Sequence, residues 1–125
     1  MSEDNVTRRK LPTPEADADR KAAPLWDGCV RYFVSALIEV GRHSLISNEQ
    51  HNPGQPMHWA QNKSTDQRNT AARHLIDADA VEGTEEEIVH LRAAAWRVLA
   101  RLQMACQRHG APVAPAARLP KGVQK

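Results

Sequence analysis

An apolar repeat in the C-terminal half is the feature that most constrains the fold of this chain. Hydrophobic side chains recur every three or four residues between Ile88 and Cys106, the spacing that places them on one face of an α-helix. The repeat follows a capping-box pattern, Thr84-Glu85-Glu86-Glu87, and stops at His109-Gly110, where glycine commonly ends a helix. Residues 84–109 are therefore predicted to form a long amphipathic helix. Its buried positions would be Ile88, Leu91, Ala95, Val98, Leu99, Leu102 and Cys106.

Two further segments have a helical period. Residues 27–47 carry an apolar stripe that runs from Phe33 to Val40. Residues 64–80 begin with a second capping box, Ser64-Thr65-Asp66-Gln67. Few side chains are aromatic, which favours aliphatic side chains between packed helices over a sheet sandwich. The predicted fold class is all-α, a small helical bundle with three main helices.

The ends of the chain differ in composition from its middle. Residues 1–23 are charged and lack an apolar period, and residues 110–125 carry prolines between alanines and lysines. Both ends are predicted to be disordered, as an N-terminal arm and a C-terminal tail, which leaves residues 24–109 as the helical domain. A domain that short buries a small fraction of its surface. We therefore expect a homo-oligomer, a dimer or tetramer, whose subunits complete the bundle.

Charge and hydropathy exclude several classes of partner. The 17 basic and 15 acidic residues are interspersed, so nucleic-acid binding is not expected. No apolar run approaches the roughly 20 residues of a membrane helix, and Met1-Ser2-Glu3-Asp4 does not begin a signal peptide. Cys29 and Cys106 lack metal-type spacing, which fits a reducing compartment. The sequence predicts a cytoplasmic protein with no membrane partner.

The segment between the first two predicted helices concentrates the chemically versatile side chains. Pro53-Gly54 and Pro56 favour a turn, and a loop of roughly sixteen residues is uncommon unless it is functional or disordered. His51 and His58 flank this turn without a cysteine partner or a nearby His-Glu pair, so zinc is not favoured there. Trp59 would either anchor the loop to the core or stack on a base, and its sequence context favours neither.

Oxygen-bearing side chains on the predicted helices suggest a different metal. Glu39 lies beside the apolar stripe of the first helix, and Asp66, Asn69 and Asp77 share a polar face of the second. Glu49 comes from the segment between them. Mg²⁺ prefers hard oxygen ligands and is often held by one or two carboxylates together with substrate phosphates. These five residues are therefore the predicted metal ligands, with Mn²⁺ as the alternative ion.

Several ordered motifs resemble those of the phage dATP/dGTP diphosphohydrolase N-terminal-domain family, which is similar to the MazG-like all-alpha nucleoside triphosphate pyrophosphohydrolases. The resemblance spans residues 20–103. Its motifs are Ala36-Leu37-Ile38-Glu39-Val40, Asn48-Glu49-Gln50-His51-Asn52-Pro53-Gly54, His58-Trp59, Lys63-Ser64, Arg73-His74-Leu75 and His90-Leu91.

The resemblance implies a Mg²⁺-dependent, homo-oligomeric hydrolase of nucleotide metabolism. Such an enzyme converts a deoxynucleoside triphosphate, with dGTP and dATP favoured, to its monophosphate and pyrophosphate. A phage-encoded enzyme would act in the cytoplasm of the infected host cell. The resemblance further implies that Glu39 and Asp66 hold the metal. Glu49, or else Asp77, would complete the metal's coordination shell or activate water. These roles make Glu39, Glu49 and Asp66 the predicted catalytic residues.

The resemblance also implies how substrate is bound, although two residues of this chain depart from the family's acid pattern. Lys63 and Arg73 would meet phosphate oxygens, whereas Trp59 with Asn52 or His58 would face the base and sugar. In MazG-like proteins each of two successive helices carries an acid pair. Here Arg42 stands where the partner of Glu39 would be, and Asn69 stands where the partner of Asp66 would be. The alternative function is therefore a catalytically weakened nucleotide-binding or assembly module; a small nucleic-acid-binding protein is the least favoured possibility.

Overall fold

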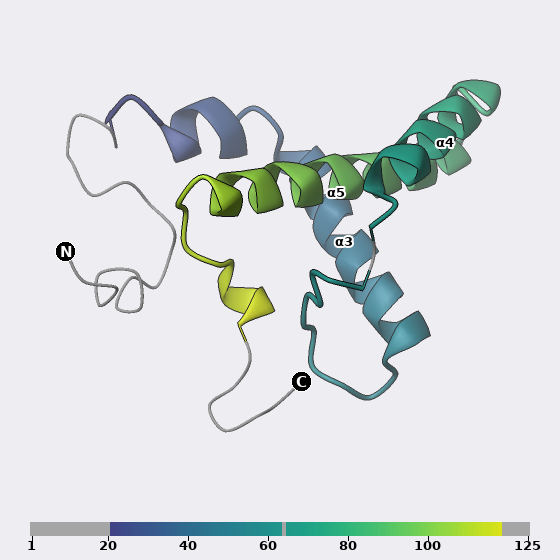
Figure 1. Ribbon diagram of the computed structural model, residues 1–125. Coiled ribbons are helices and arrows are strands. Elements are labelled where there is room, and N and C mark those ends of the chain that lie inside the picture. The colour runs from purple at the N-terminus through teal and green to yellow at the C-terminus, as the bar shows by residue number, and fades with distance from the viewer. Residues whose placement is uncertain (1–20, 64, 119–125) are drawn as a thin grey trace.

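The computed structural model describes residues 21–63 and 65–118, and within them the chain is entirely helical. Three main helices, α3 (Val34–His51), α4 (Gln67–Ala80) and α5 (Glu85–Arg108), form a small bundle (Figure 1). A short π-helical segment, η1 (Trp26–Val30), precedes them, and a 3₁₀ turn, η2 (Pro115–Ala117), follows. The predicted all-α class with three main helices is confirmed.

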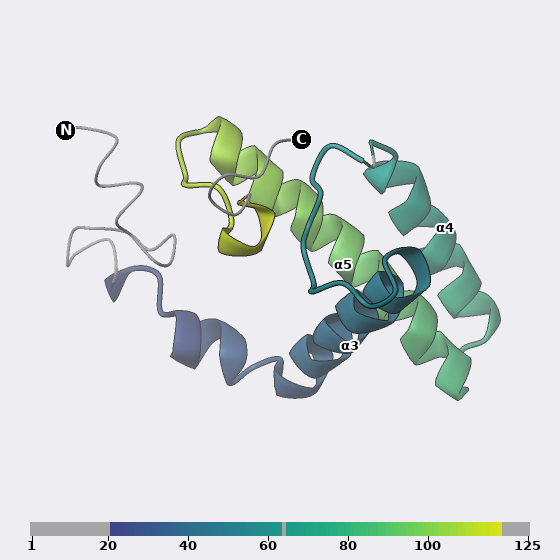
Figure 2. The ribbon, with the colours of Figure 1, turned by 90° about the horizontal axis from the view of Figure 1, so that it is seen from below.

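Helices α4 and α5 form an antiparallel hairpin, and α3 crosses it at a steep angle (Figure 2). The connecting turn contains Gly83 with a φ of 85°, a conformation that side-chain-bearing residues rarely adopt. Thr84 is the N-cap of α5, as predicted, but its hydroxyl donates to the Val81 carbonyl oxygen at 2.6 Å. The Glu87 carboxylate accepts a 3.0 Å hydrogen bond from the Gly83 amide. The cap therefore closes the turn rather than pairing Thr84 with Glu87.

The first predicted helix is displaced along the chain. The chain leaves helical geometry at Phe33, which has φ −125° and ψ 37°, so the predicted single helix over residues 27–47 is divided into η1 and α3. At its other end α3 continues to His51 and stops at Asn52, where φ is −139°. The residue before a proline disfavours helical backbone, which makes Pro53 the stop signal. Glu49 consequently lies on the last turn of α3 and not in the loop, a correction to the sequence-based prediction.

The start of α4 also differs in detail from its prediction. Its first residue is Gln67 and its N-cap is Asp66, without a side-chain capping bond. The Gln67 side chain is buried and accepts a 3.1 Å hydrogen bond from Arg97, so it does not close a capping box. Ser64, the other predicted member of that box, lies outside the described residues. The predicted end at Ala80 is confirmed.

The segment after α5 packs against the domain. Gly110, with φ 107°, reverses the chain, and the Ala111 amide bonds to the Cys106 carbonyl oxygen at 2.9 Å. Pro112 is buried. The Trp59 amide donates to the Ala116 carbonyl oxygen at 2.9 Å, which adds a tie that composition did not predict. Residues 110–118 therefore do not behave as the predicted disordered tail; residues 1–20 of the predicted arm and 119–125 of the tail lie outside the described residues.

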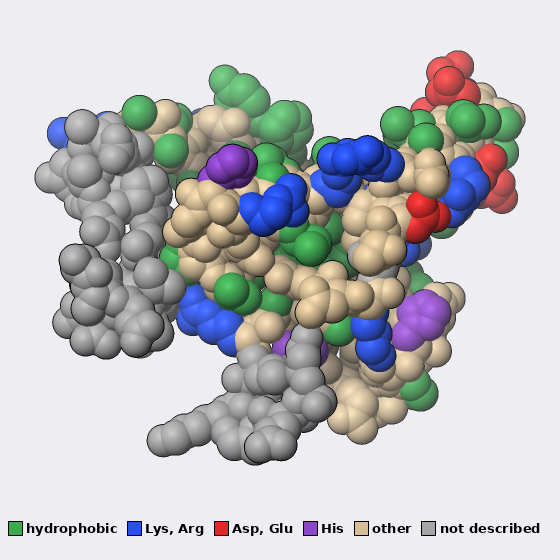
Figure 3. All heavy atoms as spheres, viewed as in Figure 1, with side chains coloured by type: hydrophobic (Ala, Val, Ile, Leu, Met, Phe, Trp, Pro, Cys, Tyr) green, Lys and Arg blue, Asp and Glu red, His purple; other side chains and the backbone are tan. Residues whose placement is uncertain are grey.

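The core is small and made of alanine. Apart from Pro112, the buried apolar residues of the described chain are Ala71, Ala78, Ala93, Ala94 and Ala100. These side chains let α4 and α5 approach closely, while larger apolar side chains are left at the surface, as Figure 3 shows over α4. Val98 is 55% exposed and Leu102 59%, although both were predicted to be buried. Within the described residues no helix is both long and apolar enough to cross a membrane.

Candidate functional site

The segment between α3 and α4 lies across α5 (Figure 2). Together with the neighbouring helices it lines a cavity of about 700 Å³, called here the indole cavity. Its walls come from the end of α3, from residues 57–63, from α5 and from Ala116. Asn52, His58, Trp59 and Lys63 all line it. The structure thus gathers four of the five side chains that the sequence predicted to bind substrate.

Two tryptophans form the apolar wall of the indole cavity. Trp59 packs edge-on against Trp96 of α5, with ring centroids 5.9 Å apart and planes at 75°. The Trp96 indole N–H donates to the Ser44 hydroxyl at 2.8 Å, which ties α5 to α3. The Arg97 guanidinium lies 5.5 Å from the centre of the Trp96 ring. Trp59 therefore does anchor the loop, and because it is only half-buried it also presents indole surface to the cavity.

Polar side chains hold the loop in place. Asn48 donates from its side-chain amide to the Gln55 carbonyl oxygen at 2.8 Å, across the Pro-Gly turn. Gln61 and Gln107 exchange two amide hydrogen bonds of 3.0 and 2.9 Å. Such bonds give an irregular segment a defined shape, which a binding surface built on a loop requires. The loop is long but ordered.

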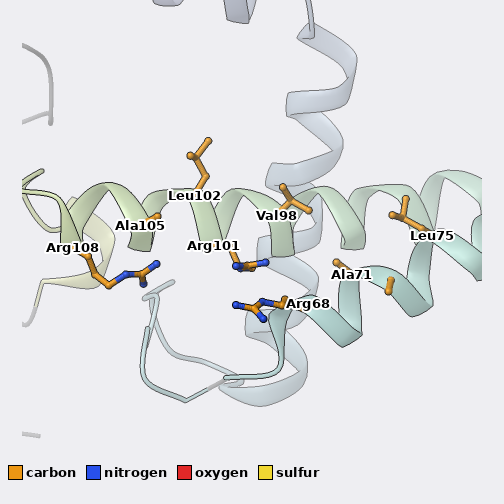
Figure 4. Close-up of a pocket in the computed structure, with 9 residues that line it drawn as sticks. Arg68, Ala71, Leu75, Val98, Arg101, Leu102, Ala105 and Arg108 are labelled. Atoms are coloured by element: carbon orange, nitrogen blue, oxygen red, sulfur yellow. The ribbon is translucent and has the colours of Figure 1, made fainter.

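A second cavity of about 710 Å³, called here the arginine cavity, lies where the start of α4 faces the end of α5. Asp66 and Asn69, two predicted metal ligands, line it together with Arg68, Arg101 and Arg108. The same three arginines also line a neighbouring, more apolar hollow between α4 and α5, where Figure 4 shows Arg68 and Arg101 facing each other. Within residues 21–63 and 65–118, no hydrogen bond or ion pair links the side chains of these three arginines to another residue. Three guanidinium groups on one hollow form a surface suited to phosphate.

The arginines of this cavity were missed by the sequence-based prediction. Arg101 and Arg108 are seven residues apart and share a face of α5, a spacing visible in the sequence. Arg68 belongs to α4, and its position opposite them follows only from the packing of the hairpin. Each arginine alone is an ordinary solvated helix charge, so the cluster has no local sequence signal.

Glu39 is neutralised by arginines. Its carboxylate accepts a 2.9 Å hydrogen bond from Arg92 of α5 and lies 3.4 Å from the Arg42 Nε. The side chain of Glu39 is 28% exposed and that of Arg92 13%. It lies at the edge of an apolar groove of about 600 Å³ that also includes Val40 and Leu75. Arg42, which replaces an acid of the MazG-like pattern, thus contributes to an ion pair here.

Asp66 is engaged by its own helix. The Asn69 side-chain amide donates to the Asp66 Oδ1 at 2.8 Å, and the Arg73 guanidinium lies 3.7 Å from Oδ2. Arg73, the fifth predicted substrate ligand, is therefore next to Asp66 and does not line the indole cavity. Asn69 acts as a hydrogen-bond donor to the acid that it was predicted to assist.

The predicted magnesium ligands do not meet in one chain. Glu49 is exposed on α3, and Asp77 lies beside two histidines on the hairpin. Among residues 21–63 and 65–118, His74, Asp77 and His90 are the only group of three potential metal-ligating side chains within reach of one ion. The described residues of a single chain therefore do not fit a Mg²⁺ site built from Glu39, Glu49, Asp66, Asn69 and Asp77.

Two histidines near the helix crossing are held in the neutral form. Burial, followed by the charges of Arg92 and Arg97, lowers the pKa of His43 from its ordinary value. Burial, followed by the neighbouring His90, lowers the pKa of His74. Both rings are therefore favoured as neutral imidazoles near pH 7, able to accept as well as donate hydrogen bonds.

Comparison with protein families, with curated proteins and with solved structures found no match to this chain.

Proposed function

We propose that the protein is a Mg²⁺-dependent (deoxy)nucleoside triphosphate pyrophosphohydrolase that acts as a homo-oligomer. Its substrate would be a purine deoxynucleotide, dGTP or dATP, and its products the monophosphate and pyrophosphate. The observation that carries the proposal is the convergence of Asn52, His58, Trp59 and Lys63 on the indole cavity. These side chains are separated by turns and by loop backbone, so their meeting in one hollow does not follow from helix geometry.

The indole cavity suits a nucleoside in size and chemistry. Its volume of about 700 Å³ lies within the roughly 300–1,000 Å³ typical of small-molecule sites. An aromatic side chain stacked on a base contributes about 1–3 kcal/mol, a role available to Trp59. Asn52 and His58 supply donors and acceptors that would select among bases, because a wrong base leaves buried polar groups without partners.

Cations near the start of α4 suit a phosphate chain. Lys63 lines the indole cavity, and Gln61, Asn62 and Thr65 from the same segment line the arginine cavity. Arginines bind phosphate oxygens in pairs of parallel hydrogen bonds, which Arg68, Arg101 and Arg108 could provide. In this proposal the nucleoside occupies the indole cavity, and the phosphates extend towards these arginines.

The proposal depends on assembly for its metal. When bound, Mg²⁺ supplies positive charge that offsets the phosphate oxygens and the leaving pyrophosphate. Glu39 borders an apolar groove that one chain leaves open. An exposed apolar surface of this kind is typical of subunit contacts. A second copy covering the groove would bring further side chains to Glu39, consistent with the expected dimer or tetramer.

A second candidate function is a nucleotide-binding or assembly module without catalysis. The observation that favours it is the ion pair of Glu39 with Arg92. Because this carboxylate is already paired with an arginine, it is less available to bind a metal ion. Such a module would use the same indole cavity and would need no metal. The two candidates therefore share a binding site and differ in turnover.

The deciding experiment measures turnover and binding together on the full-length chain. Each deoxynucleoside and ribonucleoside triphosphate is incubated with protein and Mg²⁺, with separate detection of pyrophosphate and orthophosphate, while calorimetry measures nucleotide binding. Pyrophosphate release that is lost in Trp59→Ala and kept in Trp26→Ala supports the enzyme; Trp26 is exposed in η1, outside the cavity. Binding that depends on Trp59 without turnover selects the module. Absence of both binding and turnover contradicts both functions.

A further inference from the structure

Three side chains with metal-binding chemistry meet beside the turn of the hairpin. His74 and Asp77 lie on one face of α4, three residues apart, and His90 faces them from α5. One ligand atom from each lies within 4.8 Å of the other two. The sequence pattern did not predict that these three side chains share a site, because His90 is sixteen residues from His74.

The spacing of the two imidazoles matches that of ligands on one ion. The Nδ1 atoms of His74 and His90 are 3.1 Å apart. Two nitrogens bound tetrahedrally to zinc at about 2.0–2.1 Å are separated by roughly 3.3 Å, so a small ring movement would seat an ion between them. Asp77 is exposed at the edge of the group and can turn its carboxylate towards the same point.

A fourth side chain occupies the position of an outer partner. The Glu86 Oε2 lies 3.9 Å from the His90 Nε2, the ring nitrogen that faces away from His74. Histidine ligands of metals usually place their other nitrogen against a carboxylate, which orients the ring and strengthens the metal bond. Acidic side chains gather around this turn, where α5 begins with Glu85, Glu86 and Glu87 (Figure 3).

We propose that His74, Asp77 and His90 bind a divalent transition metal ion of the zinc class, and that the ion joins α4 to α5 beside their turn. Imidazole nitrogens suit such ions, whereas Mg²⁺ favours sites made of oxygen. Three protein ligands leave one tetrahedral position for water or an external ligand. The ligands stand on two packed helices, so the site is held by rigid elements. This inference is independent of nucleotide binding.

The test uses full-length protein without an affinity tag, freed of metal by a chelator. Calorimetry measures Zn²⁺ binding, and visible absorption measures Co²⁺, whose tetrahedral complexes absorb strongly. We expect one ion per chain at micromolar protein, and no displacement by excess Mg²⁺. Glu86→Gln should weaken Zn²⁺ binding by about 10–100-fold. Loss of a direct ligand in His90→Gln or Asp77→Asn should weaken it more.

The matched control is His109→Gln, because His109 lies at the far end of α5. It should bind Zn²⁺ as the parent chain does. Circular dichroism verifies that each variant folds. If His90→Gln does not fold, Asp77→Asn provides the test, because Asp77 is exposed. A parent chain that binds no Zn²⁺, or a His90→Gln variant that binds it unchanged, overturns the proposal and leaves a hydrogen-bonded pair of histidines.

Discussion

The α4–α5 hairpin and the indole cavity are stabilised in opposite ways. The hairpin is held by alanines that bring two helix backbones together, and its larger apolar side chains point outwards. The cavity is held by a few long-range contacts, including the Trp59–Trp96 ring contact and the Gln61–Gln107 amide pair. A close helix contact tolerates no added volume, whereas a loop tied by few contacts fails when one of them is lost. The hairpin should therefore be destabilised by larger side chains at its contact, and the indole cavity by the removal of a single contact.

The largest expected effect is on the cavity. Trp96→Ala removes the ring against which Trp59 packs and the 2.8 Å bond to Ser44. Loss of a large aromatic contact costs about 3–5 kcal/mol in a full core, and half-buried Trp96 should cost about 3 kcal/mol. Urea unfolding measures the change. Trp26→Ala, at a 65% exposed position, should alter stability by about 0.5 kcal/mol or less. Equal effects of the two variants would contradict the anchoring role of Trp96.

The next effect tests the hairpin. Ala78 is 1% exposed between α4 and α5, so Ala78→Leu forces the helices apart. Overpacking of this kind costs about 1–3 kcal/mol. The control is Ala72→Leu, at an exposed position of the same helix, which should leave the free energy of unfolding nearly unchanged. A stabilised Ala78→Leu variant would show that the hairpin is not closely packed there.

A smaller effect is expected at Glu39, a predicted catalytic residue whose carboxylate joins α3 to α5 of the hairpin. Glu39→Gln deprives the largely buried Arg92 of its carboxylate. Losing a hydrogen bond to a charged group costs about 1.5–3 kcal/mol, and partial exposure places this pair at about 1.5 kcal/mol. The proposed enzyme would also lose its turnover.

A double-mutant cycle with Arg92→Gln isolates the pair. If the ion pair is the main role of Glu39, the double variant recovers part of the lost stability. Turnover restored in that double variant would contradict a metal-binding role for Glu39, because no carboxylate remains.

The smallest effect concerns pH. The pKa values of His43 and His74 are lowered in the folded chain, so below the ordinary value of 6.5 the unfolded chain binds more protons. The contribution of these two histidines to the free energy of unfolding is therefore fully present above pH 6.5, and it is lost as the pH falls through their folded-state pKa values. Urea unfolding measured between pH 8 and 5 should show the free energy of unfolding fall over this range. His43→Gln should reduce this fall, whereas His109→Gln should not; an unchanged slope in His43→Gln would contradict the assignment.

The sequence predicted helices well and their ends less well. The period of residues 84–109 and the glycine after it located α5 to within a residue at its end. The start of α4 was harder to predict. Ser64 and Gln67 matched a capping-box pattern, but the Gln67 side chain instead accepts a hydrogen bond from Arg97. A distant donor can outcompete a local cap, and no local pattern reports on it.

The candidate site divides in the same way. The resemblance to a known family predicted Asn52, His58, Trp59 and Lys63 as substrate-binding residues, and they do share a cavity. The predicted acids were chosen by helix face alone, and the arginines facing Glu39 and Asp66 come from packing or from the next turn. The predicted substrate-binding residues therefore share a cavity, whereas the charges that surround the acids were not predicted.

Sequence by itself determined the helical class, the long C-terminal helix and the residue types of the loop, because backbone propensity, apolar period and turn chemistry act over a few neighbouring positions. Only the tertiary structure decided that alanines form the core, that three arginines converge, and that His74, Asp77 and His90 meet. These features depend on how two helices cross and which of their faces touch. That choice is made by the free energy of packing the whole domain, to which each residue contributes only in the presence of its distant neighbours.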